Sequence, residues 1–138
     1  MGQIIAIDYG KARCGIAATD DMQIIASGLD TVETRFLIDF LKNYFSLNKV
    51  DAAVIGLPVD LKGNISEVET DILGFIEKFK AEFPQIEVHR FDERFTSKMA
   101  SFFISQSGKS RKQRQQKGLI DKVSATIILQ NFLEQRTR

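Results

Sequence analysis

The sequence is poor in the residues and runs that would place it in several common protein classes. Its single cysteine, Cys14, excludes an internal disulfide, and no cluster of cysteine and histidine has zinc-ligand spacing. No apolar run approaches the roughly 20 residues of a membrane-spanning helix. The first residues also lack the pattern of a signal segment. We therefore expect a cytoplasmic protein that has no membrane partner.

A strong charge of one sign is also missing, because the formal net charge is only +1. Any argument for binding to nucleic acid must therefore rest on local charge. What is present is an ordinary globular composition, with 43% hydrophobic and 27% charged residues. A chain of 138 residues is long enough for one hydrophobic core, so residues 1–138 are expected to form a single domain.

The most informative stretch is residues 4–8, where four apolar residues run directly into a carboxylate. The run Ile-Ile-Ala-Ile, bounded by Gly10, is typical of a strand that is covered on both faces. Asp8 then lies at the carboxyl end of this strand, where ligands and catalytic groups collect in open sheets. An aspartate that only forms a turn with Gly10 is the alternative.

The order of strand and helix signals predicts an α/β fold. Strands are expected at 4–8, 13–19, 23–29, 52–57 and 86–91, and helices at 35–46, between Ser66 and Pro84, from Thr96, and at 119–135. The first three strands form an antiparallel meander, and the later strands pair in parallel through helical crossovers. The prediction is a mixed five-stranded sheet with helices on both faces, in the element order of the ribonuclease H architecture. Ser66 and Glu69 are expected to form a capping box.

The last predicted helix carries a carboxylate on its apolar face. Asp121 shares a helical stripe with Ala125, Ile128 and Phe132, so its side chain points along the buried face. A carboxylate removed from water needs a partner, which can be a cation or a metal. The alternative is an acid in the first turn that only interacts with the helix dipole.

A third acid comes from the strand at 86–91, which ends in Asp92 and Glu93. Adjacent residues of a strand face opposite sides, so only one of the two can join a site that contains Asp8 and Asp121. Three carboxylates form an oxygen-rich site that suits Mg²⁺ or Mn²⁺. Two such ions about 4 Å apart can activate a water and stabilise the leaving oxygen in phosphodiester hydrolysis.

Positive charge is concentrated in one segment that contains no acid. Its members are Lys109, Arg111, Lys112, Arg114 and Lys117. This segment is a candidate for salt-sensitive contact with a phosphate backbone, and a solvated loop is the alternative. Three further candidates for contact with nucleic acid flank the acids, namely Lys11, Arg13 and Arg94.

Four motifs that occur in order along the chain carry a family resemblance. They are Ile-Asp-Tyr-Gly at 7–10 with Arg13 and Gly15; Gly56-Leu57-Pro58 with Gly63; Asp92-Glu93-Arg94 with Thr96 and Ser97; and Lys117-Gly118 followed by Asp121 and Ala125. Together they resemble the YqgF family, also called RuvX, whose members are described as Holliday junction resolvase-like proteins and as pre-16S rRNA nucleases.

The resemblance implies a ribonuclease H-like fold and a cytoplasmic nuclease that processes the 5′ end of precursor 16S rRNA. The family's motif acids fall on Asp8, Glu93 and Asp121, which selects Glu93 over Asp92. Two positions depart from the family's usual first motif, with Ala12 in place of lysine and Cys14 in place of isoleucine.

We therefore expect a metal-dependent endonuclease that acts on structured nucleic acid, with precursor rRNA as its substrate. One alternative is a resolvase-type nuclease that acts on branched DNA. Another is a catalytically weak nucleic-acid-binding module, although such a module gains nothing from three clustered carboxylates. A monomer and a homodimer are both compatible with the sequence, and a four-way junction would favour the two-fold dimer. An ATPase of the actin type needs two domains of this kind, and this chain has length for only one.

Overall fold

The structure, a computed structural model, describes residues 2–93 and 117–136. These residues form one five-stranded sheet with the strand order β3-β2-β1-β4-β5. The strands are β1 Gln3–Asp8, β2 Arg13–Thr19, β3 Ala26–Glu33, β4 Val50–Leu57 and β5 Glu87–Asp92. The helices are the 3₁₀ turn η1 Thr34–Phe36, α1 Leu37–Leu47, α2 Val68–Glu82 and α5 Lys117–Arg136.

The central strand β1 joins the two halves of the sheet. It pairs antiparallel with β2 and parallel with β4, so that Ile7 lies between Ile16 on one side and Ile55 on the other. The pair β2–β3 is antiparallel, and the pair β4–β5 is parallel. The carboxyl ends of β1, β4 and β5 therefore meet at one edge of the sheet, as the sequence predicted.

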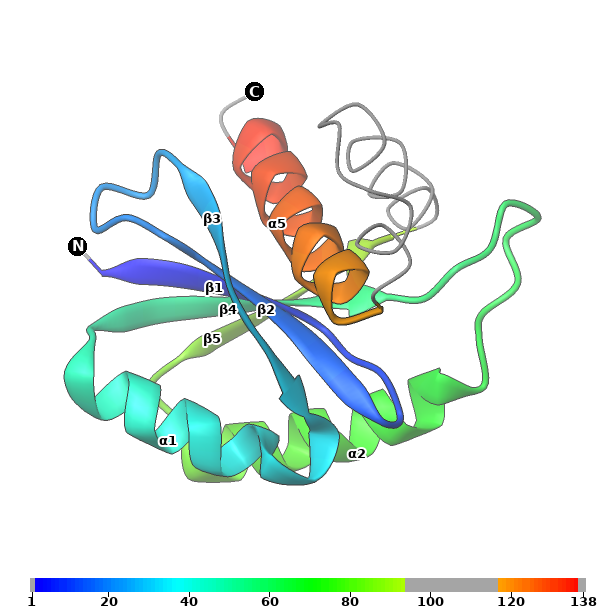
Figure 1. Cartoon of the computed structure of the whole chain (residues 1–138), viewed down its shortest axis with the longest axis horizontal. Helices are drawn as coiled ribbons and strands as arrows, with labels where there is room; N and C mark the ends of the chain where they lie inside the picture. Colours follow the sequence, from blue (N-terminus) through cyan, green and yellow to red (C-terminus); the bar gives the residue numbers. More distant parts are fainter. Residues whose placement is uncertain (1, 94–116, 137–138) are drawn as a thin grey trace.

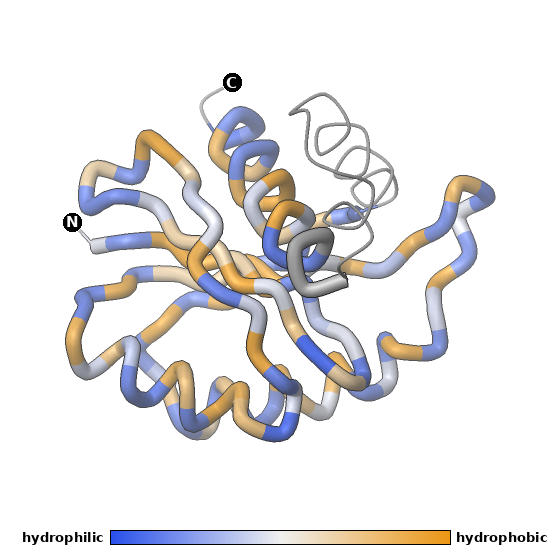
Figure 2. The backbone as a smooth tube through the Cα atoms, viewed as in Figure 1, coloured by the Kyte–Doolittle hydropathy of each residue, from blue (hydrophilic) through white to orange (hydrophobic). Residues whose placement is uncertain are grey.

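Large side chains fill the face of the sheet that α1 and α2 cover (Figure 1). Ile5, Ile7 and Ile55 point to this side and pack with Leu41 of α1 and Phe79 of α2. Hydrophilic and hydrophobic residues alternate along both helices, as expected of helices with one buried face (Figure 2). This face holds most of the aromatic core.

Small side chains cover the opposite face, where α5 packs. Ala6, Ala17 and Ala52 are buried there against α5 residues that include Ala125 and Ile128. The approach is closest at Gly15 of β2, where an added Cβ would overlap the carbonyl oxygen of Asp121. The small residues therefore let the first turns of α5 lie directly on the sheet, and this brings Asp121 to the strands.

The predicted topology and the helices on both faces are confirmed, and two local predictions are wrong. The third strand begins at Ala26 instead of 23, because Asp20 Oδ1 accepts the N–H groups of Ile24 (2.8 Å) and Ile25 (2.9 Å) and holds them in a turn. The capping box does not form, because the Glu69 carboxylate binds Arg90 of β5.

The helix expected from Thr96 lies outside the described residues. Within the described ranges, the structure contains no helix that is both long enough and apolar enough to cross a membrane.

Candidate active site

Two of the predicted acids meet where β1, β4 and β5 end. Asp8 is the last residue of β1 and points to the α5 face, following the alternation of Ile4 and Ala6. Glu93 follows β5, and its N–H donates to the carbonyl of Leu57 at 3.1 Å, which continues the pairing with β4. The side chains of Asp8 and Glu93 are joined by a hydrogen bond.

The two adjacent acids at the end of β5 lie in different surroundings. Asp92 is exposed, whereas Glu93 is partly buried and lies over Gly56 of β4. A Cβ added at Gly56 would overlap the Glu93 carboxylate. The glycine of the Gly-Leu-Pro motif therefore provides the space in which Glu93 reaches Asp8.

The third acid, Asp121, comes from α5 and is held by an arginine. Arg13 Nε donates to Asp121 Oδ2 at 2.8 Å, and the two side chains are 35% and 26% exposed. The partner that Asp121 was expected to need is thus a cation from β2. Asp121 is also close enough to Asp8 for its charge to raise the pKa of that carboxyl group.

Burial and like charge act together on these acids. Burial raises the pKa of Asp8 well above its usual range, and the charges of Glu93 and Asp121 raise it further. Burial also raises the pKa of Glu93, while the hydrogen bond with Asp8 and the nearby Arg90 charge lower it. A hydrogen bond between two carboxyl groups requires a proton, so Asp8 and Glu93 share one at a pH below the raised pKa of Asp8 when no cation is bound.

The donor set suits a hard divalent cation, because it is made only of carboxylate oxygens. A cation between Asp8 and Glu93 would replace the shared proton and relieve the repulsion between the two acids. Within the described residues, no three Cys, His, Asp or Glu side chains already converge in an arrangement that could hold a metal ion. The contact with Arg13 holds one Asp121 oxygen on the guanidinium.

Sequence reasoning missed Arg90, which fixes the strand end beneath Glu93. Its guanidinium binds both carboxylate oxygens of Glu69 at 2.6 and 3.0 Å, and it donates to the carbonyls of Ile55 (3.1 Å) and Gly56 (3.0 Å). One side chain thereby connects β4, β5 and α2. The available signal was the period of two in β5, which places Arg90 on the same covered face as Val88.

The remaining predicted residues are not all placed by the structure. Lys11 is exposed in the turn that follows Asp8. Arg94, Lys109, Arg111, Lys112 and Arg114 lie outside the described residues, and Lys117 is described only as the start of α5.

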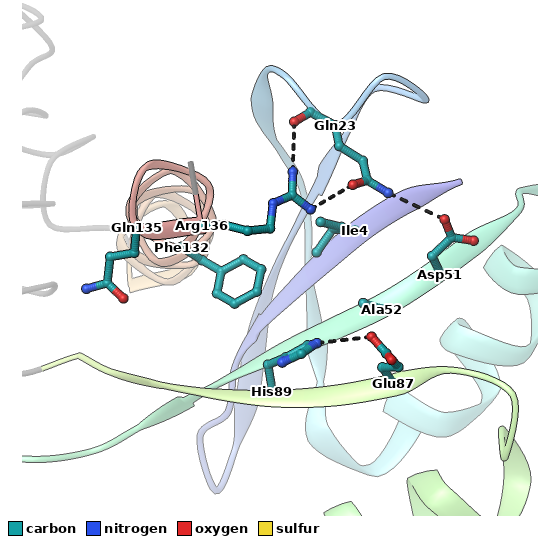
Figure 3. A pocket seen from close by; sticks show the side chains of 9 residues that line it. All are labelled: Ile4, Gln23, Asp51, Ala52, Glu87, His89, Phe132, Gln135 and Arg136. Carbon is teal, nitrogen blue, oxygen red and sulfur yellow. Dashed lines mark hydrogen bonds and ion pairs between the residues drawn. The ribbon is translucent and has the colours of Figure 1, made fainter. Parts of the chain in front are cut away.

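The opposite edge of the sheet has a cavity of about 690 Å³ (Figure 3). His89 lies there with its ring 5.3 Å from that of Phe132, and its Nε2 lies 3.4 Å from a carboxylate oxygen of Glu87. His89 thus packs against α5, at the end of the sheet opposite to the acids.

Comparison with known proteins identifies the family of the chain. A family model described as "RuvX: Holliday junction resolvase" matches residues 2–135. The chain belongs to the RuvX family. A relative from Flavobacterium johnsoniae is 55% identical over 136 residues, which cover 99% of each chain. RuvX-type relatives from Bacteroides fragilis (46% identical, 97% of each chain) and Porphyromonas gingivalis (46% identical, 100% of each chain) are also similar. All three carry the name "Putative pre-16S rRNA nuclease".

Solved structures establish the fold of this RuvX chain. RuvC of Thermus thermophilus in complex with a Holliday junction substrate superposes with a TM-score of 0.58 and 14% identity, covering 99% of this chain and 96% of RuvC. A second structure of the same RuvC gives a TM-score of 0.56. At this identity the likeness concerns the fold alone, and it confirms the predicted ribonuclease H-like architecture.

Proposed function

We propose that this chain is a nuclease that hydrolyses phosphodiester bonds in structured nucleic acid with the help of divalent metal ions. The observation that carries the proposal is the hydrogen-bonded pair of Asp8 and Glu93, with Asp121 close by, at the carboxyl edge of the sheet. Both carboxyl groups have raised pKa values, which means that their ionised forms destabilise the fold. A pair that costs stability is better explained by a function than by a structural role.

Asp8 and Glu93 are the residues that would hold the cation, with Asp121 as the third ligand and Mg²⁺ or Mn²⁺ as the ion. A site with two ions would neutralise the phosphate and activate the attacking water. Arg13 positions Asp121 through the 2.8 Å contact with its carboxylate. Arg90 holds the ends of β4 and β5 so that Glu93 stays beside Asp8.

Positive side chains around the acids are proposed to bind the phosphate backbone. Lys11 lies next to the site in the β1–β2 turn, and Arg13 borders it. The basic residues of the sequence between 94 and 117, which were predicted to bind nucleic acid, complete this proposal. Contacts of this kind weaken steeply with salt.

The proposed substrate is the 5′ end of precursor 16S rRNA, and the proposed place of action is the cytoplasm. The support for this substrate is the shared name of the relatives, which are up to 55% identical and match the whole length of the chain. The description of the family model favours a second candidate, a four-way DNA junction. A two-fold dimer would present two sites to such a junction, whereas one RNA end needs a single site.

The test measures cleavage of a labelled precursor 16S rRNA fragment and of a labelled four-way DNA junction. Each substrate is incubated with Mg²⁺, Mn²⁺ or EDTA, and the wild type is compared with Asp8→Asn and with Asp92→Asn as the matched control. We expect metal-dependent cleavage of the RNA by the wild type and by Asp92→Asn, and none by Asp8→Asn. Preferred cleavage of the junction would replace the RNA substrate with DNA. Salt-sensitive binding without any cleavage would contradict the nuclease proposal.

A further inference from the structure

The segment 58–66, which we call the arm, projects from the end of β4 (Figure 1). Glu93 lies at its base, where its N–H donates to the carbonyl of Leu57 at 3.1 Å. Its two ends are joined by a bridge between Val59 and Ile65, and by the Ser66 N–H, which donates to the Pro58 carbonyl at 2.9 Å. These backbone contacts give the arm a defined shape without the support of the core.

The tip of the arm is fixed by a carboxylate. Asp60 Oδ1 accepts the N–H groups of Lys62 at 2.9 Å and Asn64 at 2.8 Å. Gly63 has a φ of 90°, a left-handed conformation that favours glycine. Asp60 therefore acts within the arm, where its carboxylate holds Asn64 in place.

A cleft of about 300 Å³ lies between the arm and the candidate active site, and Glu93 forms part of its wall. Pro58, Val59 and Ile65 give it apolar sides, and the polar lining consists of Asp60, Asn64, Ser66 and Glu93. No lysine or arginine occurs among the described residues that line it. The cleft thus offers hydrogen-bond acceptors and apolar surface, and its two acids repel a phosphate.

The two uncharged polar residues can each accept a hydrogen bond. The Asn64 side chain is hydrogen-bonded to the Asp60 carboxylate, to which only its NH₂ group can donate. Its amide oxygen is then directed elsewhere. Among the described residues, the Ser66 hydroxyl has one long contact, in which its Oγ lies 3.4 Å from the Val68 nitrogen, and it keeps a donor and an acceptor position.

We infer that this cleft binds the ribose of a nucleotide beside the cleaved phosphodiester, and that Asn64 and Ser66 recognise its 2′-hydroxyl. A ribose presents the donor that these oxygens accept, and its carbon face fits the apolar sides formed by Val59 and Ile65. A deoxyribose lacks this hydroxyl, so the cleft discriminates RNA from DNA. The inference rests on the proposed function, because it is Glu93 that places the cleft beside the reaction.

The test uses the precursor 16S rRNA fragment of the cleavage assay, the all-DNA strand of the same sequence, and a series of these RNAs that carry one 2′-deoxynucleotide each. Cleavage rates with Mn²⁺ and dissociation constants in EDTA are measured for the wild type and for Asn64→Ala/Ser66→Ala. Both substituted residues are exposed, so the variant should fold. Lys62→Ala is the matched control, because Lys62 lies on the same arm but does not line the cleft.

We expect one deoxy position, at a fixed distance from the cut, to lower the wild-type rate about tenfold, as the loss of one hydrogen bond does. In Asn64→Ala/Ser66→Ala this position should have no effect, while Lys62→Ala should behave as the wild type. An unchanged RNA-to-DNA ratio in the double variant would overturn the inference.

If the wild type cuts neither polymer, the nuclease proposal fails and the binding data decide on the cleft. RNA that binds more tightly than DNA, with a preference that the double variant loses, would support the cleft as a ribose site without catalysis. Equal binding of the two polymers by the wild type would overturn it.

Discussion

Glu69 and Asp8 are both partly buried near the carboxyl end of β4, on opposite faces of the sheet, and their surroundings differ. The Glu69 carboxylate receives two hydrogen bonds from Arg90, and the same guanidinium satisfies two backbone carbonyls. Asp8 instead shares a hydrogen bond with Glu93 and lies close to the charge of Asp121. The first acid is compensated and the second is surrounded by other acids.

The difference indicates what each face of the sheet is for. A buried acid whose partner is an arginine connects elements of the fold, and its removal affects stability. Acids that raise each other's pKa values are costly to the fold and are typical of functional sites. Substitution of Asp8 should therefore reduce cleavage without loss of stability. Substitution of Arg90 should reduce the stability of the fold.

The largest effect is expected for Asp8→Asn on cleavage, because the amide removes a charged ligand while it keeps the size of the side chain. We expect the rate under single-turnover conditions to fall by roughly 10³-fold or more, since Asp8 acts on the charge that develops at the reacting phosphate. Asp92→Asn should retain the rate of the wild type. Equal cleavage rates for Asp8→Asn and Asp92→Asn would show that Asp8 contributes no more to cleavage than the exposed Asp92.

Removal of Arg90 should give the largest loss of stability. Arg90→Met leaves Glu69 partly buried with no guanidinium, and we expect the free energy of unfolding to fall by about 3 kcal/mol in urea denaturation. Arg90→Met/Glu69→Leu should recover more than half of this loss, because an apolar pair avoids the uncompensated charge. A double variant that is as unstable as the single one would show that the two carbonyl contacts dominate.

Smaller losses of stability are expected for alanine at two glycines. One substitution should mainly disturb packing, and the other should mainly reduce cleavage. Gly15→Ala forces α5 away from β2, because the new methyl group meets the backbone carbonyl of Asp121, and we expect a loss of about 2 kcal/mol. Gly56→Ala instead meets the end of the Glu93 side chain, which can move. It should cost less stability but displace Glu93 and reduce cleavage. Thermal unfolding and cleavage assays on both variants test this order.

The smallest effect is a pH-dependent gain in stability in Asp8→Asn. The folded pKa of Asp8 is raised above its unfolded value, so the native state holds its proton longer and loses stability as pH rises through that window. Asparagine has no such loss. The melting temperatures of the two proteins should therefore be similar in acid, below the usual carboxyl range, and the variant should melt a few degrees higher at neutral pH. A difference that grows towards acid would contradict the raised pKa.

Most of the sheet could be predicted from the sequence, because a strand that is buried on both faces appears as a continuous run of apolar residues. Apolar runs predicted β1 and β4, and the carboxylates at the ends of β1 and β5 were expected at one edge of the sheet. Asp121 was identifiable because a charge on an apolar helical stripe needs a partner. That this partner is Arg13, 108 positions away in sequence, depends on how closely α5 packs on β2.

Contacts between distant elements account for the rest. Glu69 matched a local capping pattern, but tertiary contact with Arg90 is stronger than a cap, since it contains two charged hydrogen bonds. The choice of Glu93 over Asp92 required the family resemblance, because the period of a strand says that two neighbours face apart but not which one faces the site. The cleft beside the arm depends on the conformation of a turn, which the sequence indicated only through Gly63.

Calorimetric titration with Mn²⁺ tests most directly whether the acids at this edge form a metal site. The wild type, Asp8→Asn and Asp92→Asn are titrated in two buffers that differ in their heat of protonation. We predict that the wild type binds Mn²⁺ and releases the proton shared by Asp8 and Glu93, at a pH below the raised pKa of Asp8. Asp92→Asn should behave in the same way, and Asp8→Asn should lose most of the binding. Equal Mn²⁺ affinity in the wild type and Asp8→Asn, or binding without proton release, would contradict the claim that the acids at this edge form a metal site.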